Sequence, residues 1–145
     1  MRLLTIGFTK KTAEQFFSRL VEAGARRIVD VRLNNVSQLA GFTKKDDLKY
    51  FLRAIGKIDY IHVPDLAPTQ EMLDRYKKEK GDWSAYEREF LKLMRQRRIE
   101  TSMRDAIASD DCLLCSEPTA EHCHRRLVAE YLQQHWRDIE VRHLR

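Results

Sequence analysis

Short apolar runs alternate with longer amphipathic segments from one end of the chain to the other. The runs are four or five residues long, which is typical of strands buried in a sheet. The segments between them repeat apolar residues every three or four positions, which is typical of helices that cover a sheet. The runs predict strands over 3–6, 27–31, 59–63, 112–115 and 139–143. The segments predict helices over 12–24, 43–56, 69–80, 84–94, 101–108 and 124–135.

Several of the predicted helices have recognisable end signals. Thr12-Ala-Glu-Gln15 and Ser84-Ala-Tyr-Glu87 fit a capping box, in which two side chains bind the free backbone N–H groups of the first turn. Thr43 is expected to cap another helix. Gly24 and Gly56 are expected to end two helices, because glycine adopts the left-handed conformation of a helix end at low cost.

The order of the elements predicts one α/β domain over residues 1–145. A strand, a helix and a strand occur within the first 31 residues, and such units build parallel sheets. We therefore expect a mostly parallel sheet of about five strands flanked by helices, with a helical insert between strands three and four. No internal repeat and no linker rich in Pro, Gly or Ser divides the chain.

Polar residues follow the predicted strands at the edge of the sheet where α/β proteins usually bind ligands. The segment 112–126 is the richest in reactive groups, because it holds all three cysteines, two of the five histidines and a pair of arginines. It also leads into a helix, whose positive N-terminal end attracts anions and favours the thiolate form of a nearby cysteine.

These residues indicate an enzyme that acts on an anionic substrate, such as a phosphate-bearing molecule, a nucleotide or a nucleic acid. The arginines would hold the anion, the carboxylates would position it or exchange protons, and Cys115 or Cys123 would be a nucleophile or a thiol of the site. The expected catalytic residues are Cys115, Glu117, Cys123 and Asp30. The expected substrate-binding residues are Gly7, Thr9, Arg32, His62, His124 and Arg125.

Structural roles compete with these assignments. Asp30 could instead pair with Arg32 at the base of a loop, and Cys123 could belong to the apolar face of the last helix. A rhodanese-like or phosphatase-like cysteine enzyme is a further alternative. The active loops of such enzymes are tight, however, whereas nine residues separate Cys115 from Arg125 here.

A structural zinc site is another alternative. The potential ligands are Cys112, Cys115, His122, Cys123 and His124. A regular strand points Cys112 and Cys115 to opposite faces of the sheet, because side chains alternate along a strand. We therefore expect neither a metal nor another cofactor.

The charge of the chain permits an anionic partner without requiring one. The formal net charge is +5 and the pI is about 9.2, but basic and acidic residues are interleaved almost everywhere. A binding module that uses Arg95, Arg97, Arg98 and Arg125 on nucleic acid is therefore an alternative to an enzyme. We expect no membrane partner and a cytoplasmic location, because the sequence has neither a signal peptide pattern nor a spanning segment.

Five short motifs are spread along the chain: Thr5-Ile-Gly-Phe-Thr9, Asp30-Val-Arg32, Tyr60-Ile-His-Val-Pro-Asp-Leu66, Leu113-Leu-Cys-Ser-Glu117 and Cys123-His-Arg125. Through these motifs the chain resembles the family called domain of unknown function 488. They occur in the family's order and cover nearly the whole chain. The resemblance implies the fold and the position of the site, and it implies no particular reaction.

Two positions of the first motif differ from the family pattern. Phe8 stands where the family typically has histidine, and Thr9 stands where it has serine. If that histidine carries out acid–base chemistry in the family, this chain has lost the function or has moved it to His62 or His124.

Overall fold

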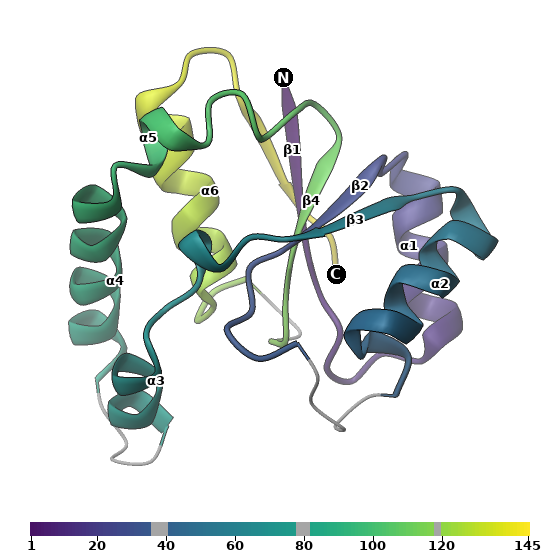
Figure 1. Cartoon of the computed structure of the whole chain (residues 1–145), viewed down its shortest axis with the longest axis horizontal. Helices are drawn as coiled ribbons and strands as arrows, with labels where there is room; N and C mark the ends of the chain where they lie inside the picture. The colour runs from purple at the N-terminus through teal and green to yellow at the C-terminus, as the bar shows by residue number, and fades with distance from the viewer. Residues whose placement is uncertain (36–40, 78–81, 118–119) are drawn as a thin grey trace.

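The computed structural model describes residues 1–35, 41–77, 82–117 and 120–145 (Figure 1). The strands are β1 (Arg2–Gly7), β2 (Arg27–Asp30), β3 (Asp59–His62), β4 (Asp111–Cys115) and β5 (Glu140–His143). The α-helices are α1 (Ala13–Ala23), α2 (Lys45–Gly56), α3 (Gln70–Lys77), α4 (Trp83–Arg97), α5 (Ile99–Ser102) and α6 (His124–His135). Two short 3-10 helices, η1 (Gly41–Thr43) and η2 (Pro64–Leu66), precede α2 and α3.

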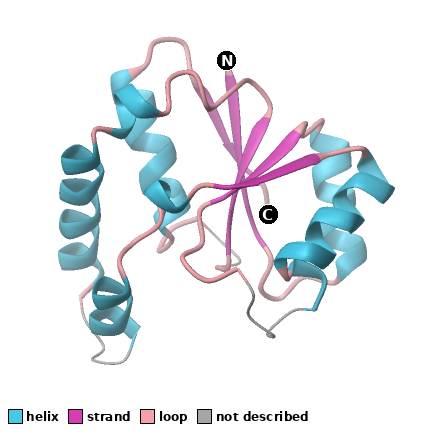
Figure 2. Cartoon of the chain, viewed as in Figure 1, coloured by secondary structure: helices cyan, strands magenta, loops and turns pink. Residues whose placement is uncertain are grey.

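The five strands form one parallel sheet in the order β3-β2-β4-β1-β5. Helices flank the sheet on both sides (Figure 2), and α3 to α5 lie between β3 and β4 in the chain (Figure 1), so the predicted α/β fold with its helical insert is confirmed. None of the helices described is both long enough and apolar enough to cross a bilayer.

Each face of the sheet packs against its own helices. Helices α1 and α2 cover one face, where Phe16, Leu20 and Leu48 are completely buried. Helices α3 to α6 cover the other face, where Phe90 and Leu132 are completely buried. The alternation of β1 explains this division, since successive side chains enter the two cores in turn.

Strand β4 occupies a special place in this topology. It lies between β2 and β1, whose following helices α2 and α1 cover one face, whereas its own following helix, α6, covers the other. After β4 the chain therefore turns to one face of the sheet, whereas after each of its neighbours, β1 and β2, it turns to the other face. Such switch points open a crevice beyond the carboxyl ends of the strands, where α/β proteins bind ligands.

The predicted end signals of α1 are confirmed, whereas both of those predicted for α2, Thr43 and Gly56, are wrong. The hydroxyl of Thr12 accepts from the amide of Gln15, the Gln15 side chain accepts from the amide of Thr12, and Gly24 adopts the left-handed conformation with φ 74°. Helix α2 begins one residue after Lys44, and Lys57 rather than Gly56 takes the left-handed position. Thr43 instead ends η1, and its carbonyl accepts from a buried arginine side chain.

The helical insert also differs from its prediction. Helix α4 begins at Trp83, one residue before the predicted capping box, and its N-cap residue Asp82 makes no side-chain capping bond. Helix α5 is a single turn, Ile99–Ser102, rather than a helix over 101–108. Part of the helix predicted over 69–80 lies outside the described residues.

Candidate functional site

A cavity of about 220 Å³ opens beyond the carboxyl end of β4. Its walls come from the strand ends of β1, β2 and β4, from the N-terminus of α6 and from the helical insert. The residues that line it are Phe8, Arg32, Leu33, Asn34, Pro68, Leu73, Tyr76, Trp83, Tyr86, Cys115, Ser116, Glu117, His122, Cys123 and His124. The cavity thus lies in the crevice that the topology of the sheet creates.

Two thiols and an imidazole meet on the wall of this cavity. The sulfur atoms of Cys115 and Cys123 and a ring nitrogen of His124 lie within 4.8 Å of one another, and all three residues are buried. Cys115 ends β4, Cys123 is the N-cap of α6, and His124 is the first residue of that helix. Cys112 packs in the opposite core, so the predicted separation of Cys112 from Cys115 is confirmed.

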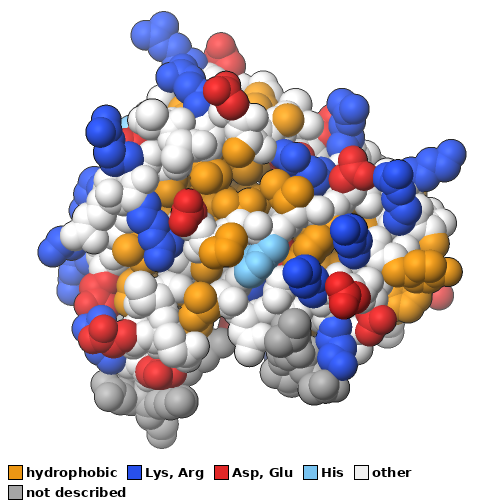
Figure 3. Space-filling view, viewed as in Figure 1, with side chains coloured by type: hydrophobic (Ala, Val, Ile, Leu, Met, Phe, Trp, Pro, Cys, Tyr) orange, Lys and Arg blue, Asp and Glu red, His pale blue; other side chains and the backbone are white. Residues whose placement is uncertain are grey.

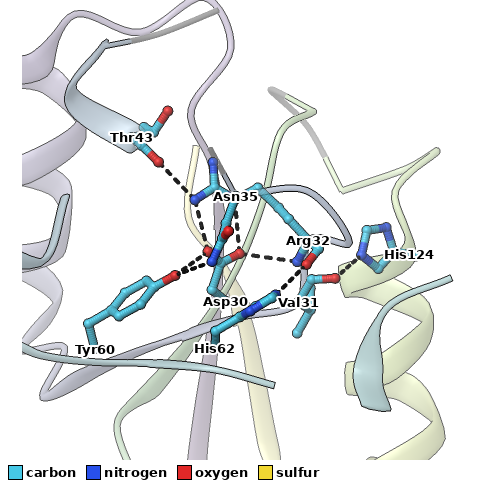
Figure 4. A network of polar contacts seen from close by, with 8 residues as sticks. All are labelled: Asp30, Val31, Arg32, Asn35, Thr43, Tyr60, His62 and His124. Carbon is cyan, nitrogen blue, oxygen red and sulfur yellow. Dashed lines mark hydrogen bonds and ion pairs between the residues drawn. The ribbon is translucent and has the colours of Figure 1, made fainter. Parts of the chain in front are cut away.

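The hydrogen bonds of His124 determine which of its nitrogens faces the thiols. Its Nε2 lies 2.7 Å from the carbonyl oxygen of Val31 (Figure 4), and because that oxygen can only accept, Nε2 carries the proton. The other nitrogen, Nδ1, lies 3.4 Å from the sulfur of Cys115. In the neutral ring Nδ1 is therefore a base beside a thiol.

The pKa values of the two thiols are shifted in opposite directions. Burial by itself raises the pKa of the Cys115 thiol, but the Cys123 thiol, the amide of Ser116 and the Arg125 guanidinium together hold that pKa below its usual value. Burial raises the pKa of the Cys123 thiol well above its usual value, and the interaction with Cys115 raises it further. Cys115 is thus the thiol that ionises first, and Cys123 keeps its proton.

Arg125 lies behind the thiols rather than on the cavity wall. Its side chain is completely buried, and Nη1 donates to the Glu117 carbonyl at 2.6 Å and to the Cys123 sulfur at 3.5 Å. Its Nη2 has no hydrogen-bond partner among the described residues. A buried guanidinium group with no carboxylate partner in the described structure favours a neighbouring thiolate.

Gly7 makes room for this arrangement. A Cβ atom at this position would lie only 1.5 Å from the carbonyl oxygen of Glu117 and 2.7 Å from Nη1 of Arg125. The glycine at the end of β1 therefore lets the loop after β4 come close enough for Glu117 and Arg125 to bond.

A second buried network holds Arg32 in the cavity wall (Figure 4). Nε and Nη2 of Arg32 donate to the two carboxylate oxygens of Asp30 at 2.9 and 2.8 Å. The hydroxyl of Tyr60 donates to the same carboxylate at 2.6 Å, and burial followed by the charge of Asp30 raises the pKa of Tyr60. The Asp30 carboxylate is thus fully occupied in positioning Arg32 and Tyr60.

The structure divides the predicted site residues into a wall and a layer behind it. Five of them line the cavity: Arg32, Cys115, Glu117, Cys123 and His124. Four others bond to lining residues or lie close against them from behind: Gly7, Asp30, His62 and Arg125. Thr9 is exposed, and its backbone amide donates to the carbonyl of Ser116.

The aromatic part of the cavity wall was not predicted. Tyr76, Trp83 and Tyr86 of the helical insert form an aromatic cluster, in which Trp83 stacks on Tyr86 with the ring centroids 5.2 Å apart. On its other side Trp83 stacks on His122 at 5.0 Å. Three aromatic residues within eleven positions were the only sequence signal for this wall.

The thiol cluster is also the group best suited to hold a metal ion. Cys115, Cys123 and His124 offer three ligands, and the cavity leaves a fourth position open. Zinc accepts two cysteines and one histidine in catalytic sites, and the bond from His124 to Val31 is the kind of support that a metal-bound histidine usually has. Cys112 takes no part in this cluster.

The basic residues considered for nucleic-acid binding are partly used inside the protein. Nη1 of Arg97 donates to the carbonyl oxygens of Asp65 and Ala67, and so holds the loop between β3 and α3. On the face shown in Figure 3, Lys and Arg side chains are interspersed with Asp and Glu. That face shows mixed charge rather than a basic stripe.

A family model described as "Domain of unknown function DUF488" matches residues 12–132. The chain belongs to the DUF488 family. This match confirms the resemblance inferred from the sequence motifs. Neither a curated protein nor a solved structure matches the chain.

Of the two positions that depart from the first DUF488 motif, Phe8 lies on the cavity wall and Thr9 does not. Phe8 lines the cavity, and the guanidinium carbon of Arg32 lies 5.4 Å from the centre of its ring. A histidine at this position would thus face the same cavity as Cys115. Of the two histidines considered as substitutes, His124 lines the cavity, whereas Nε2 of His62 lies 2.7 Å from the Arg32 carbonyl behind it.

Proposed function

We propose that this DUF488 protein is an enzyme that uses the Cys115 thiolate as a nucleophile against an anionic substrate. The observation that carries the proposal is the position of the Cys115 sulfur. It lies on the wall of a cavity, 3.4 Å from a ring nitrogen of His124 and in the field of the buried Arg125. A thiol becomes a strong nucleophile when neighbouring groups hold it as a thiolate, and these are such neighbours.

The anionic character of the substrate is supported by the groups around the thiol. Arg32 lines the cavity, and Asp30 fixes its planar guanidinium group in one orientation. The amides of Ser116 and Glu117 interact with the Cys115 sulfur and would also lie near an anion bound there. The exposed carboxylate of Glu117 at the cavity wall would orient polar groups of the substrate.

The chemistry that follows is a displacement. The Cys115 thiolate would attack an electrophilic atom of the substrate, forming a bond from sulfur to that atom, and the leaving group would depart with its electron pair. His124 would take the thiol proton at Nδ1 and return it to the leaving group. Arg125 would act through Cys115 by stabilising its charge, and Asp30 would act through Arg32.

Protection against a thiol reagent tests this proposal. Iodoacetamide is uncharged, so its reaction with each cysteine reports whether the thiolate is accessible. We expect phosphate, sulfate or adenosine monophosphate to slow alkylation of Cys115 compared with sodium chloride at equal ionic strength, with peptide mapping to identify the cysteine. Alkylation of Cys115 at the same rate in all four solutions would reject an anion site at the thiol, and no alkylation of Cys115 would reject the nucleophile.

The thiol cluster also supports a second candidate function, a zinc-dependent hydrolase. Cys115, Cys123 and His124 would bind the metal, which would activate a water molecule at the open position. Charge favours the first candidate, because two thiolates would neutralise the zinc ion and leave the buried Arg125 without an anion. Metal analysis of the purified protein separates the two, since stoichiometric zinc would support the second.

A further inference from the structure

We propose that Cys115 and Cys123 form a reversible disulfide, and that the protein reduces small anionic disulfides by two electrons. This inference rests on the proposed function, because it needs Cys115 as the nucleophile. It goes beyond that function by naming the class of substrate and by giving Cys123 a catalytic role.

The geometry that supports a disulfide is the placement of both sulfurs on one wall. They lie within 4.8 Å of each other, and both residues line the cavity that would hold the substrate. Cys123 is the N-cap of α6, where the backbone is extended, with φ −138° and ψ 137°. A disulfide bond brings two sulfurs to about 2.05 Å, and rotation about the two χ1 angles is the movement that changes their separation.

The two cysteines differ in the way that a dithiol centre requires. The pKa of Cys115 is held below its usual value against the cost of burial, because the Cys123 thiol, the Ser116 and Glu117 amides and Arg125 stabilise its charge, and His124 Nδ1 lies 3.4 Å from its sulfur. Cys123 holds its proton, since burial and the adjacent Cys115 charge both raise its pKa. One thiol therefore attacks first, and the other remains a thiol until the first has reacted.

The reaction can be written with atoms and electrons balanced. The Cys115 thiolate attacks one sulfur of a disulfide RSSR, so the bond from Cys115 to SR forms, the RS–SR bond breaks, and the first RS⁻ leaves. Cys123 then gives its proton to Nδ1 of His124 and attacks the Cys115 sulfur. The Cys115–Cys123 bond forms, the second RS⁻ leaves, and it takes up the proton. A dithiol reductant restores the two thiols.

The reacted state explains why Cys123 becomes active only in the second step. Once Cys115 carries SR, it bears no negative charge. The repulsion that raised the pKa of Cys123 is then gone, and Arg125 remains 3.5 Å from the Cys123 sulfur. The buried guanidinium group of Arg125 would thus stabilise the thiolate of Cys115 in the first step and that of Cys123 in the second. It also has no carboxylate partner among the described residues that would compete for it.

The test treats the reduced full-length protein with glutathione disulfide and follows intact mass and peptide maps. The wild type is expected to lose the mass of two hydrogen atoms and to give a peptide in which Cys115 and Cys123 are joined. Cys123→Ser is expected to stop at a glutathione adduct on Cys115, with complete loss of the internal disulfide. Cys112→Ser is the matched control, because Cys112 lies in the opposite core, and it is expected to behave as the wild type.

The outcomes separate this inference from the function on which it rests. If the wild type ends as the same stable glutathione adduct as Cys123→Ser, the disulfide inference is wrong. The proposed role of Cys115 as a nucleophile is then still supported. If Cys115 forms no adduct in either protein, both are wrong. Circular dichroism shows whether each variant is folded. Cys123→Ala, which must give the same adduct, replaces Cys123→Ser if that variant does not fold, and Cys112→Ala replaces Cys112→Ser in the same way.

Discussion

Replacing Asp30 with Asn is expected to lower the free energy of unfolding by about 3–5 kcal/mol, because Arg32 would keep its charge in a buried site without a carboxylate. Both side chains are nearly inaccessible, with 0% of Asp30 and 6% of Arg32 exposed. Tyr60 would also lose its bond to a charged acceptor. In a thermal melt this change corresponds to a Tm lower by about 6–20 °C.

A surface ion pair is the matched control for this experiment. Asp59 pairs with Arg53 at 2.7 Å, the same kind of contact, but 65% and 73% of these side chains are exposed. Asp59→Asn is therefore expected to cost about 1 kcal/mol or less. Equal losses in the free energy of unfolding in Asp30→Asn and Asp59→Asn would show that burial of the Asp30–Arg32 pair has no energetic consequence. Such a result would contradict the role given to Asp30 in positioning Arg32.

Replacing Arg125 with Gln is expected to slow alkylation of Cys115 at pH 7, by about tenfold for each unit by which the pKa of the thiol rises above 7. The physical reason is that Arg125 contributes to holding this pKa low, together with the Cys123 thiol and the Ser116 and Glu117 amides. The change should act on the thiolate fraction, so the rates of mutant and wild type should converge at high pH.

Two variants control for the loss of a large buried side chain. Arg125→Lys keeps the charge and is expected to retain most of the reactivity of Cys115. Arg126→Gln removes the neighbouring arginine, which pairs with Glu87 and Glu130 instead of contacting the thiols, and is expected to react as the wild type. A wild-type alkylation rate in Arg125→Gln would contradict the electrostatic role given to Arg125.

The fold could be predicted from local patterns, but the order of its strands could not. Apolar runs and amphipathic segments reflect the burial of each element, so they identify strands and helices one by one. The position of β4 between β2 and β1 depends on which helices cover which face, and this is decided by packing between distant segments. The caps expected at Thr43 and Ser84 were wrong because short helical turns and tertiary contacts displaced the helix starts.

The position of the candidate site could be predicted from the sequence, but which residues line the cavity and which lie behind its wall could not. Because parallel strand ends meet at one edge, the sequence brought Arg32, Cys115 and His124 to one place. It could not tell which charged groups face the cavity, and Asp30 and Arg125 lie behind the wall. The aromatic wall around Trp83 was missed, since it depends on how α3 and α4 pack across from β4.

The wild-type protein is expected to carry a thiolate at Cys115 near neutral pH, and the pH dependence of alkylation measures this. The rate at each cysteine is measured by peptide mapping after short treatment with iodoacetamide between acidic and alkaline pH. We expect Cys115 to reach half its maximal rate at a pH below the pKa of about 8.5 typical of free cysteine, and Cys123 to react only at higher pH. A half-maximal rate for Cys115 at or above that value, or faster reaction at Cys123, would contradict it.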